Sequence, residues 1–363
     1  MTLKIHVLNV GSGDSTVIEY IDENNTLWAV IDCYKENESH ESETLKFLKQ
    51  KNVTEIYSIC LTHPDLDHYN GLLELVDYFS DRGRNLTRFI APILDHTKYK
   101  SIPNSKREEQ KLRALYSLLS QLAEKDKIHY DQFGYGQPIF FPYTDKVIAL
   151  GPLVINTEKY AKQIYEREKK RNIGEKPSKV DKNLLSVIIG IIGPKTLTIL
   201  CSDATSHIIE TTLKRFTGDR KKSNEITLFN FVKVPHHGSA ESNYPDLWSH
   251  YCIKNISVAG ISAGPKYGHP HLEVVKNILE SNVKVYCTNK VGCIRSITQN
   301  KSVAINESSS TIIEGLQQST KSINLSATCE PLHGTITFID DGAEIKIETE
   351  YQELPILSLD NPY

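Results

Sequence analysis

The sequence predicts an α/β protein, in which short buried strands alternate with amphipathic helices. Several apolar runs have the length and composition of buried strands, among them residues 56–61 and 226–234. Leucines repeat at the spacing of one helix face at Leu112, Leu115, Leu119 and Leu122. Polar residues rich in His and Asp follow directly after several apolar runs. Sites in α/β proteins form at such strand ends, because the strands are rigid and the loops after them aim side chains.

The first half of the chain is expected to alternate strands and helices. The predicted strands cover residues 4–10, 16–20, 26–32, 56–61 and 88–94. The predicted helices cover residues 42–51, a segment that begins near Gly71, and a segment that begins at the capping box of Ser105 and Glu108. Asp14 and Asp32 lie at the ends of strands or turns. They are either turn residues or carboxylates that orient metal ligands.

The second half is expected to contain further strands and a helix. Its predicted strands cover residues 184–192, 196–201, 226–234, 255–261, 283–287, 292–297, 334–339 and 343–348. A helix is predicted over residues 205–216, followed by a basic turn at 219–222. We expect one domain over residues 1–298, with residues 299–363 completing it as a loop and a strand pair. A basic insertion around residues 156–182 is either a solvated surface or a flap that contacts nucleic acid.

The composition is that of an ordinary globular protein, because 39% hydrophobic and 24% charged residues exclude a disordered chain. A net charge of −3 excludes a protein that is basic all over. No apolar run is long enough to cross a bilayer, and the first residues lack the apolar core of a signal peptide. We therefore expect a cytoplasmic protein without a membrane partner. The seven cysteines are scattered and without a C-x-x-C pair, so we expect reduced core residues.

The most informative stretch is residues 61–71, Leu-Thr-His-Pro-Asp-Leu-Asp-His-Tyr-Asn-Gly. Four candidate metal ligands fall within six positions: His63, Asp65, Asp67 and His68. They lie between a predicted strand and a predicted helix, whose positive N-terminal end favours an anion nearby. Histidine and carboxylate ligands suit zinc, manganese or iron. The alternative is a polar loop with chance histidines.

Three later predicted strands also end in polar residues that can bind a metal or act in catalysis. Asp203 follows the first of them, and His236 and His237 follow the second. Adjacent histidines at a strand end are rarely core residues, so at least one of them is expected to be a ligand or a catalytic group. His269 follows the third strand in another loop with histidines.

Together these segments resemble the metallo-β-lactamase fold superfamily, whose His-x-His-x-Asp-His loop is followed by an Asp after one strand and a His after a later strand. The closest resemblance is to the metallo-β-lactamase-like domain of bacterial competence proteins of the ComEC type. The shared segments lie in matching order at residues 10–14, 31–32, 63–68, 234–239 and 267–270. The resemblance covers roughly residues 3–297.

This resemblance implies a four-layer αββα sandwich of mixed sheets flanked by helices, with the metal loop and the later loops meeting at one edge. The implied ligands are His63 and Asp65 for the first metal, Asp67 and His68 for the second, Asp203 as a bridge, and His237, or alternatively His236, as the last ligand. Two features depart from the family pattern. ComEC-type proteins are membrane channels, so DNA uptake is not implied here. The superfamily also supplies a third histidine to the first metal, whereas the histidines between the loop and Asp203 are His96 and His129, neither in such a motif. The ComEC-like pattern has Asn and Ser in this region, as at Asn183 and Ser186.

Asp65 stands where the superfamily has its second histidine, which makes the ligand set harder and more anionic. We therefore expect two divalent metal ions, zinc or manganese, with magnesium as a further option. Such a pair generates hydroxide and stabilises both oxygens of a displacement at phosphorus. Asp67 is expected to be catalytic. His269 is expected either to donate a proton to the leaving oxygen or to bind a phosphate oxygen, with Lys266 as electrostatic support; a plain turn histidine is the alternative.

The leading hypothesis is a metal-dependent phosphodiesterase, a nuclease that acts on DNA or RNA. It is motivated by the harder ligand set, the ComEC-like segments and the basic stretches at residues 162–182 and 214–222. A hydrolase of a small ester, lactone or phosphoester is the alternative, which the near-neutral net charge favours. A third hypothesis is a non-catalytic, metal-bound interaction module with protein partners in a multi-component system.

Overall fold

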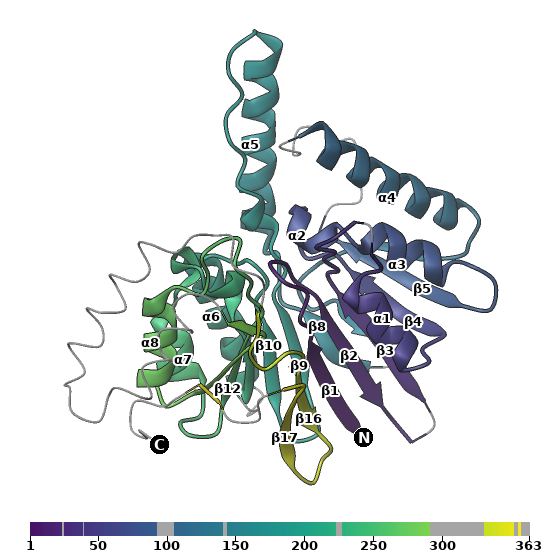
Figure 1. Cartoon of the computed structure of the whole chain (residues 1–363). Coiled ribbons are helices and arrows are strands. Elements are labelled where there is room, and N and C mark those ends of the chain that lie inside the picture. The colour runs from purple at the N-terminus through teal and green to yellow at the C-terminus, as the bar shows by residue number, and fades with distance from the viewer. Residues whose placement is uncertain are drawn as a thin grey trace.

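Two large mixed β-sheets lie face to face, with helices on both outer sides, in the computed structural model of this chain (Figure 1). The structure describes residues 1–23, 25–38, 40–92, 105–140, 144–222, 227–290, 330–351 and 355–356. The predicted αββα architecture is confirmed by this arrangement. Within these ranges, no helix combines the length and the apolar character that a membrane crossing requires.

The first sheet has eight strands in the order β17-β16-β1-β2-β3-β4-β5-β6. Its strands are β1 (Thr2–Val7), β2 (Thr16–Ile21), β3 (Thr26–Ile31), β4 (Glu55–Cys60), β5 (Asn85–Ala91), β6 (His129–Gln132), β16 (Ile336–Asp340) and β17 (Ile345–Thr349). Pairing is antiparallel from β17 to β3 and parallel from β3 to β6. The parallel half is connected through helices α1 (Glu43–Gln50), α3 (Leu72–Phe79) and α4 (Lys106–Glu124).

The second sheet has seven strands in the order β13-β12-β11-β10-β9-β8-β7. Its strands are β7 (Pro138–Phe140), β8 (Thr144–Ala149), β9 (Ile189–Ile192), β10 (Leu197–Leu200), β11 (Phe231–Lys233), β12 (Val258–Ile261) and β13 (Lys284–Cys287). Its parallel half, β10 to β13, is connected through α6 (Ser206–Lys222), α7 (Pro245–Tyr251) and α8 (Leu272–Glu280). A short ribbon joins β14 (Asn289–Lys290) to β15 (Glu330–Pro331).

Three apolar layers hold the sandwich together. The middle layer lies between the sheets, where Phe231 stacks on Phe338 with ring centroids 5.0 Å apart. A second layer packs α1, α3 and α4 against the outer face of the first sheet, and a third packs α6, α7 and α8 against the second sheet. The central strands are therefore buried on both faces, which explains why they read as continuous apolar runs in the sequence.

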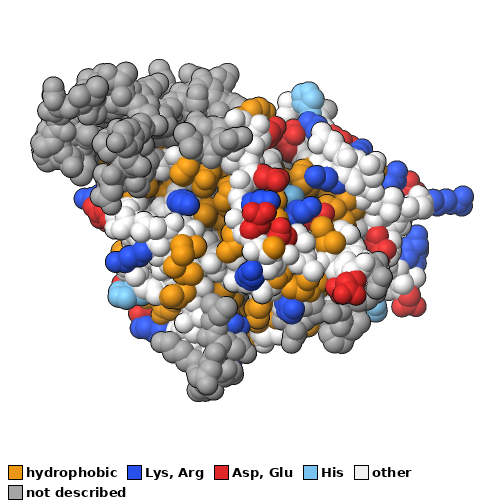
Figure 2. Space-filling view, turned by 90° about the horizontal axis from the view of Figure 1, so that it is seen from below, with side chains coloured by type: hydrophobic (Ala, Val, Ile, Leu, Met, Phe, Trp, Pro, Cys, Tyr) orange, Lys and Arg blue, Asp and Glu red, His pale blue; other side chains and the backbone are white. Residues whose placement is uncertain are grey.

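Helix α5 (Val154–Asn172) projects away from the body of the protein (Figure 1). Its last turn carries Lys169, Lys170 and Arg171, where cations interact favourably with the helix dipole. The chain returns through residues 173–181 and re-enters the body at the 3₁₀ turn η2 (Lys182–Leu185). On the face seen from below in Figure 2, cationic and anionic side chains are interspersed among apolar ones, so this face has no field of one sign.

Several predicted boundaries are wrong, and three of them concern the basic stretches or the strands that lead to the site. The strand expected over residues 184–192 begins only at Ile189, because η2 occupies the first positions. The basic stretch at 219–222 is the end of α6 and not a turn, with the Arg220 guanidinium 5.4 Å from the ring of Phe216 one turn earlier. Within the described residues, the strand expected over 226–234 is limited to β11, although the Asn230 backbone before it still donates to the Leu197 carbonyl at 2.7 Å.

Several predictions fall on residues that the structure does not describe. They concern the strand over 292–297, most of the loop over 299–331, His96, and the cysteines Cys293 and Cys329. The five cysteines in the described ranges are buried, as expected for core residues.

Candidate metal centre

The candidate site lies where parallel strands of both sheets have their carboxyl ends. The metal loop follows β4, Asp203 follows β10, and the two histidines of residues 236–237 follow β11. The loop then forms a short helix, α2 (Leu66–Tyr69), which carries Asp67 and His68. Backbone bonds fasten α2 to its neighbours, since Asp14 donates to the Asp67 carbonyl at 2.9 Å and Cys33 donates to the His68 carbonyl at 2.8 Å.

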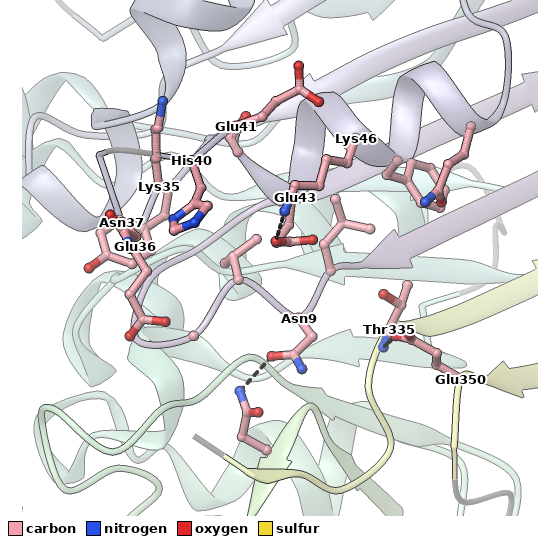
Figure 3. A pocket seen from close by; sticks show the side chains of 18 of the residues that line it. Asn9, Lys35, Glu36, Asn37, His40, Glu41, Glu43, Lys46, Thr335 and Glu350 are labelled. Carbon is pink, nitrogen blue, oxygen red and sulfur yellow. Dashed lines mark hydrogen bonds and ion pairs between the residues drawn. The ribbon is translucent and has the colours of Figure 1, made fainter. Parts of the chain in front are cut away.

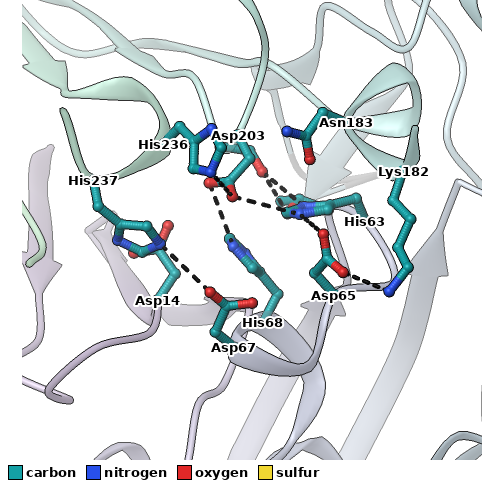
Figure 4. A network of polar contacts seen from close by, with 12 residues as sticks. Asp14, His63, Asp65, Asp67, His68, Lys182, Asn183, Asp203, His236 and His237 are labelled. Carbon is teal, nitrogen blue, oxygen red and sulfur yellow. Dashed lines mark hydrogen bonds and ion pairs between the residues drawn. The ribbon is translucent and has the colours of Figure 1, made fainter. Parts of the chain in front are cut away.

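Buried side-chain atoms without hydrogen-bond partners converge at the centre of this site (Figure 4). Among the described residues, the atoms in question are His63 Nε2, His68 Nε2, His237 Nε2 and Asp203 Oδ1. Leaving such atoms unpaired away from water costs free energy, and each needs an explanation. All of them are metal-ligand atoms, so a bound cation would satisfy them together.

Asp203 stands between the histidines of the metal loop and those after β11. Its Oδ1 lies 3.4 Å from His68 Nε2, and its Oδ2 lies 3.7 Å from His63 Nε2. His236 Nε2 lies 3.4 Å from the same Oδ2. Burial opposes the charged carboxylate, but His68 and His236 hold the pKa of Asp203 well below its usual value. Asp203 is therefore an anionic group that faces both halves of the site.

The described residues contain three overlapping groups of three ligand atoms, the third of which comprises Asp14, Asp32 and His68. The other two groups each join two histidines to one carboxylate, namely His63, His68 and Asp203, and Asp67, His68 and His237. Within each group the atoms lie within 4.8 Å of one another. Two imidazoles with one carboxylate are a donor set that zinc, manganese and iron accept in proteins. The residues present therefore fit divalent metal ions.

Each histidine of the two groups is oriented by a contact behind its ring. His68 Nδ1 lies 2.7 Å from Asp32 Oδ2, and His237 Nδ1 lies 2.8 Å from the carbonyl of Ser262. His63 Nδ1 lies 3.2 Å from the Thr62 hydroxyl. Such contacts fix the ring and leave Nε2 as the metal-binding nitrogen. Asp32 thus lies behind the candidate ligand His68, which is the position that one of the two interpretations of Asp32 requires.

The adjacent histidines turn their side chains to different partners. His237 Nε2 lies 3.9 Å from Asp67 Oδ2, whereas His236 approaches Asp203. Both residues have positive φ, 49° for His236 and 53° for His237, and Ser202 beside Asp203 has φ 46°. This backbone region is uncommon for residues with a β-carbon, and strain of this kind clusters at functional sites. The backbone is thus arranged to present both rings to the site.

His269 also reaches the site, and Lys266 lies beside the ring of Tyr267. The ring of His269 lies 5.6 Å from that of His236, and its buried Nδ1 has no hydrogen-bond partner among the described residues. Burial, reinforced by His237 and His236, lowers the pKa of His269 to about 4. The Lys266 ammonium lies 4.7 Å from the centre of the Tyr267 ring. His129, an alternative third histidine of the first metal, is exposed on β6.

Two lysines contact the acidic residues of the site, and sequence reasoning missed both. Lys182 donates to Asp65 Oδ1 at 2.6 Å, and the buried Lys233 forms an ion pair with Asp14. Asp14 lies 219 positions before Lys233 in the chain, and Asp65 lies 117 positions before Lys182. No local pattern reveals such pairs. The available signal was only that Lys182 ends the basic stretch next to Asn183 and that Lys233 interrupts an apolar strand.

A second hollow, of about 780 Å³, lies apart from the metal loop (Figure 3). Its lining includes Lys35, Glu36, His40, Glu43 and Lys46. Two of its lysines are already paired, Lys35 with Glu74 at 2.8 Å and Lys46 with Glu43 at 2.6 Å. None of the ligand residues named above lines it, so the metal centre is the stronger candidate for catalysis.

No protein-family model matches the chain, and no curated protein matches it significantly. Some solved structures are similar. The metallo-β-lactamase fold protein YhfI from Bacillus subtilis is 10% identical, with a TM-score of 0.41 over 78% of this chain and 96% of its own. Zinc-bound PqqB from Methylobacterium extorquens is 10% identical, with a TM-score of 0.39 over 78% of this chain and 97% of its own. A diphosphatase of the PhnP family is 11% identical, with a TM-score of 0.36 over 79% of this chain and 86% of its own. Each TM-score is below 0.5, so these proteins do not identify a substrate for this chain.

Proposed function

We propose that the protein is a metal-dependent hydrolase of the metallo-β-lactamase type that cleaves phosphodiester bonds in DNA or RNA. The observation that carries the proposal is the convergence of buried, unpartnered ligand atoms from the metal loop, Asp203 and His237. His63, Asp65 and Asp203 would hold a first divalent ion, with His236 beside them. Asp67, His68, Asp203 and His237 would hold a second. When bound, such a pair activates water and stabilises charge on the oxygens around phosphorus.

The protein's own groups prepare this chemistry before any substrate arrives. Asp32 and the Ser262 carbonyl hold the rings of His68 and His237 with Nε2 toward the centre. His269 faces the same space, and its lowered pKa leaves a neutral imidazole at pH 7. A neutral imidazole donates a hydrogen bond but has no extra proton to transfer. This favours the phosphate-binding role of His269 over the proton-donating one.

The projecting helix α5 supports a polymeric substrate. Between Lys162 and Lys182 the chain has eight Lys or Arg against four Asp or Glu. This segment returns to the body at Lys182, whose side chain contacts the metal-loop residue Asp65. A phosphate backbone that passes through the metal centre would therefore lie close to the foot of a cationic projection. Neutralising phosphates in this way supplies affinity that depends steeply on salt.

The direct test is cleavage of single-stranded DNA, duplex DNA and RNA with zinc, manganese or magnesium. We expect at least one polymer to be cut, and Asp203→Asn to abolish cutting. Asp246→Asn, an exposed residue of α7, is the matched control and should behave as wild type. If a metal-loaded wild type leaves all three polymers intact, the phosphodiesterase proposal is wrong.

Binding experiments test the role of α5. Replacing Lys169, Lys170 and Arg171 together by Gln should weaken binding of the polymer and lower the slope of log Kd against log salt by about 2 to 3. The triple replacement of Lys254, Lys276 and Lys284 by Gln, between the end of α7 and the start of β13, should change neither quantity. Equal effects of the two triple variants would contradict a specific role of α5.

A hydrolase of a small ester, lactone or phosphoester is the second candidate. The net charge of −3 favours it, since a protein that is not cationic overall does not concentrate a polyanion. A small substrate releases few counterions, so its binding would depend little on salt and not at all on α5. The salt slope therefore separates the two candidates.

A further inference from the structure

The two carboxylate oxygens of Asp65 face different groups (Figure 4). Its Oδ1 accepts a hydrogen bond from Lys182 Nζ at 2.6 Å. Its Oδ2 lies 3.5 Å from His63 Nε2, a nitrogen that has no hydrogen-bond partner among the described residues. One oxygen is thus already bound by a cation of the protein, while the other faces the space that a metal would share with His63.

Lys182 is fixed in this position by the turn that it opens. Its neighbour Asp181 accepts from the Asn183 backbone at 3.0 Å and donates its own N–H to Gln163 of α5 at 2.7 Å. The Lys182 side chain is only 8% exposed, and within the described ranges Asp65 is the one carboxylate within 4.0 Å of its ammonium. A buried ammonium is screened little by solvent, so its charge acts strongly on nearby groups.

The charge of this pair changes what Asp65 offers to a metal. A lone carboxylate at this position adds one negative charge to the ligand set, but a carboxylate paired with an ammonium adds none. Asp65 with Lys182 is therefore equivalent in net charge to a neutral histidine. The additional anionic character expected from Asp65 alone is offset inside the protein.

We propose that Lys182 sets the affinity of the first metal site, because it occupies one oxygen of Asp65 and its positive charge opposes the cation that the other oxygen would hold. The two sites are then unequal, and the second site, without a lysine on its carboxylate Asp67 in the described residues, fills first. The proposal rests on the metal centre proposed above and is independent of a phosphodiester substrate.

Metal titration of variants at Lys182 tests this proposal directly. Lys182→Met keeps the length and apolar stem of the side chain, Lys182→Arg keeps its charge, and Lys179→Met removes an exposed cation three positions away. Each is made in the wild type and with Asp67→Asn, which weakens the second site. Affinity for Zn²⁺ and Mn²⁺ is measured by competition with a chromophoric chelator, so no substrate is needed.

We expect Lys182→Met to bind metal at the first site about tenfold or more tightly than wild type. Loss of a group that supports a metal ligand usually weakens metal binding by a similar factor, whereas loss of Lys182 should strengthen it. Lys182→Arg and Lys179→Met should bind as wild type does. The rise in Tm on adding metal should also be larger for Lys182→Met, because a ligand that binds the folded state more tightly stabilises it more. Unchanged or weaker first-site affinity in a folded Lys182→Met would overturn the proposal, since the lysine would then only position Asp65.

Folding of the variants is checked by circular dichroism. If Lys182→Met does not fold, Lys182→Gln and Lys182→Arg test the proposal in its place. Tighter metal binding by Lys182→Gln than by Lys182→Arg supports the proposal, and equal metal binding by these two variants refutes it. If the variants show the expected metal affinities but the wild type cleaves no polymer, the proposed function is refuted and the proposal for Lys182 is not. Absence of metal binding in the wild type would refute both.

Discussion

Asp32→Asn is expected to disrupt the metal centre through the orientation of a single ring. Asp32 Oδ2 accepts from the Thr62 hydroxyl at 2.6 Å and lies 2.7 Å from His68 Nδ1, while its Oδ1 accepts from the Thr62 backbone at 2.8 Å. Both oxygens must therefore accept. An asparagine has one acceptor and one donor group, so its NH₂ must face either His68 Nδ1 or the backbone N–H.

The first of these arrangements reverses the tautomer of His68. An amide that donates to Nδ1 leaves the proton on Nε2, the nitrogen that must bind metal. Loss of such a contact behind a ligand costs about 10- to 100-fold in metal affinity, or ~1.4–2.8 kcal/mol. The backbone is not the cause, because the φ of 59° at Asp32 is one that asparagine also adopts.

Chelator competition with Zn²⁺ measures this loss, with Asp81→Asn on an exposed turn as the matched control. Removal of hydrogen bonds to a buried charge should also lower the free energy of unfolding of the metal-free protein by roughly 1.5–3 kcal/mol. Wild-type metal affinity in Asp32→Asn would refute the reasoning, since the carboxylate would then have no influence on His68.

Three further predictions follow from contacts described above. Asp203→Ala should eliminate stoichiometric binding of both metals, measured by elemental analysis after dialysis, because Asp203 faces both halves of the site; retention of two ions would contradict this. Burial opposes the charged form of His68, but Asp203 and Asp32 hold its pKa well above the usual value, so the metal-free protein keeps a proton that metal must displace. Metal affinity should therefore rise with pH up to that raised pKa, and calorimetry in buffers of different ionisation enthalpy should show proton release at pH 7; binding without release would refute it. Gly264→Ala should lower the free energy of unfolding by about 1–3 kcal/mol in denaturant titration, because its β-carbon would lie 2.6 Å from backbone atoms of Gly11 and Ser12; wild-type stability would show that these loops yield easily.

The sequence indicated the edge of the fold that carries the site because its ligands follow directly after buried strands. Asp203 and His237 are far from the metal loop in the chain, yet each occupies the same kind of position, and parallel strands bring such positions together. The sequence could not show that His236 approaches Asp203 while His237 approaches Asp67, because this depends on the backbone angles of the two histidines.

Other features depend on contacts that leave no local pattern. The strands β6 and β7 are short, and β6 carries polar residues such as His129 and Asp131, so no alternation marked them. Residues near Leu184 are apolar enough for a strand, but a 3₁₀ turn forms there instead. The ion pair of Lys182 with Asp65 joins residues 117 positions apart, and only the packing of the sheets brings them together.

The ribbon of β14 and β15 has a consequence for engineering the chain. Asn289 pairs with Pro331 and Lys290 pairs with Glu330, so the two ends of the intervening segment are held as neighbours. After this ribbon the chain adds β16 and β17 to the edge of the first sheet, where Ile5 pairs with Phe338. Closing a connection whose ends are already adjacent costs little entropy, and the cost depends only weakly on length. A connection of any length between Lys290 and Glu330 would therefore leave β16 able to reach its place beside β1.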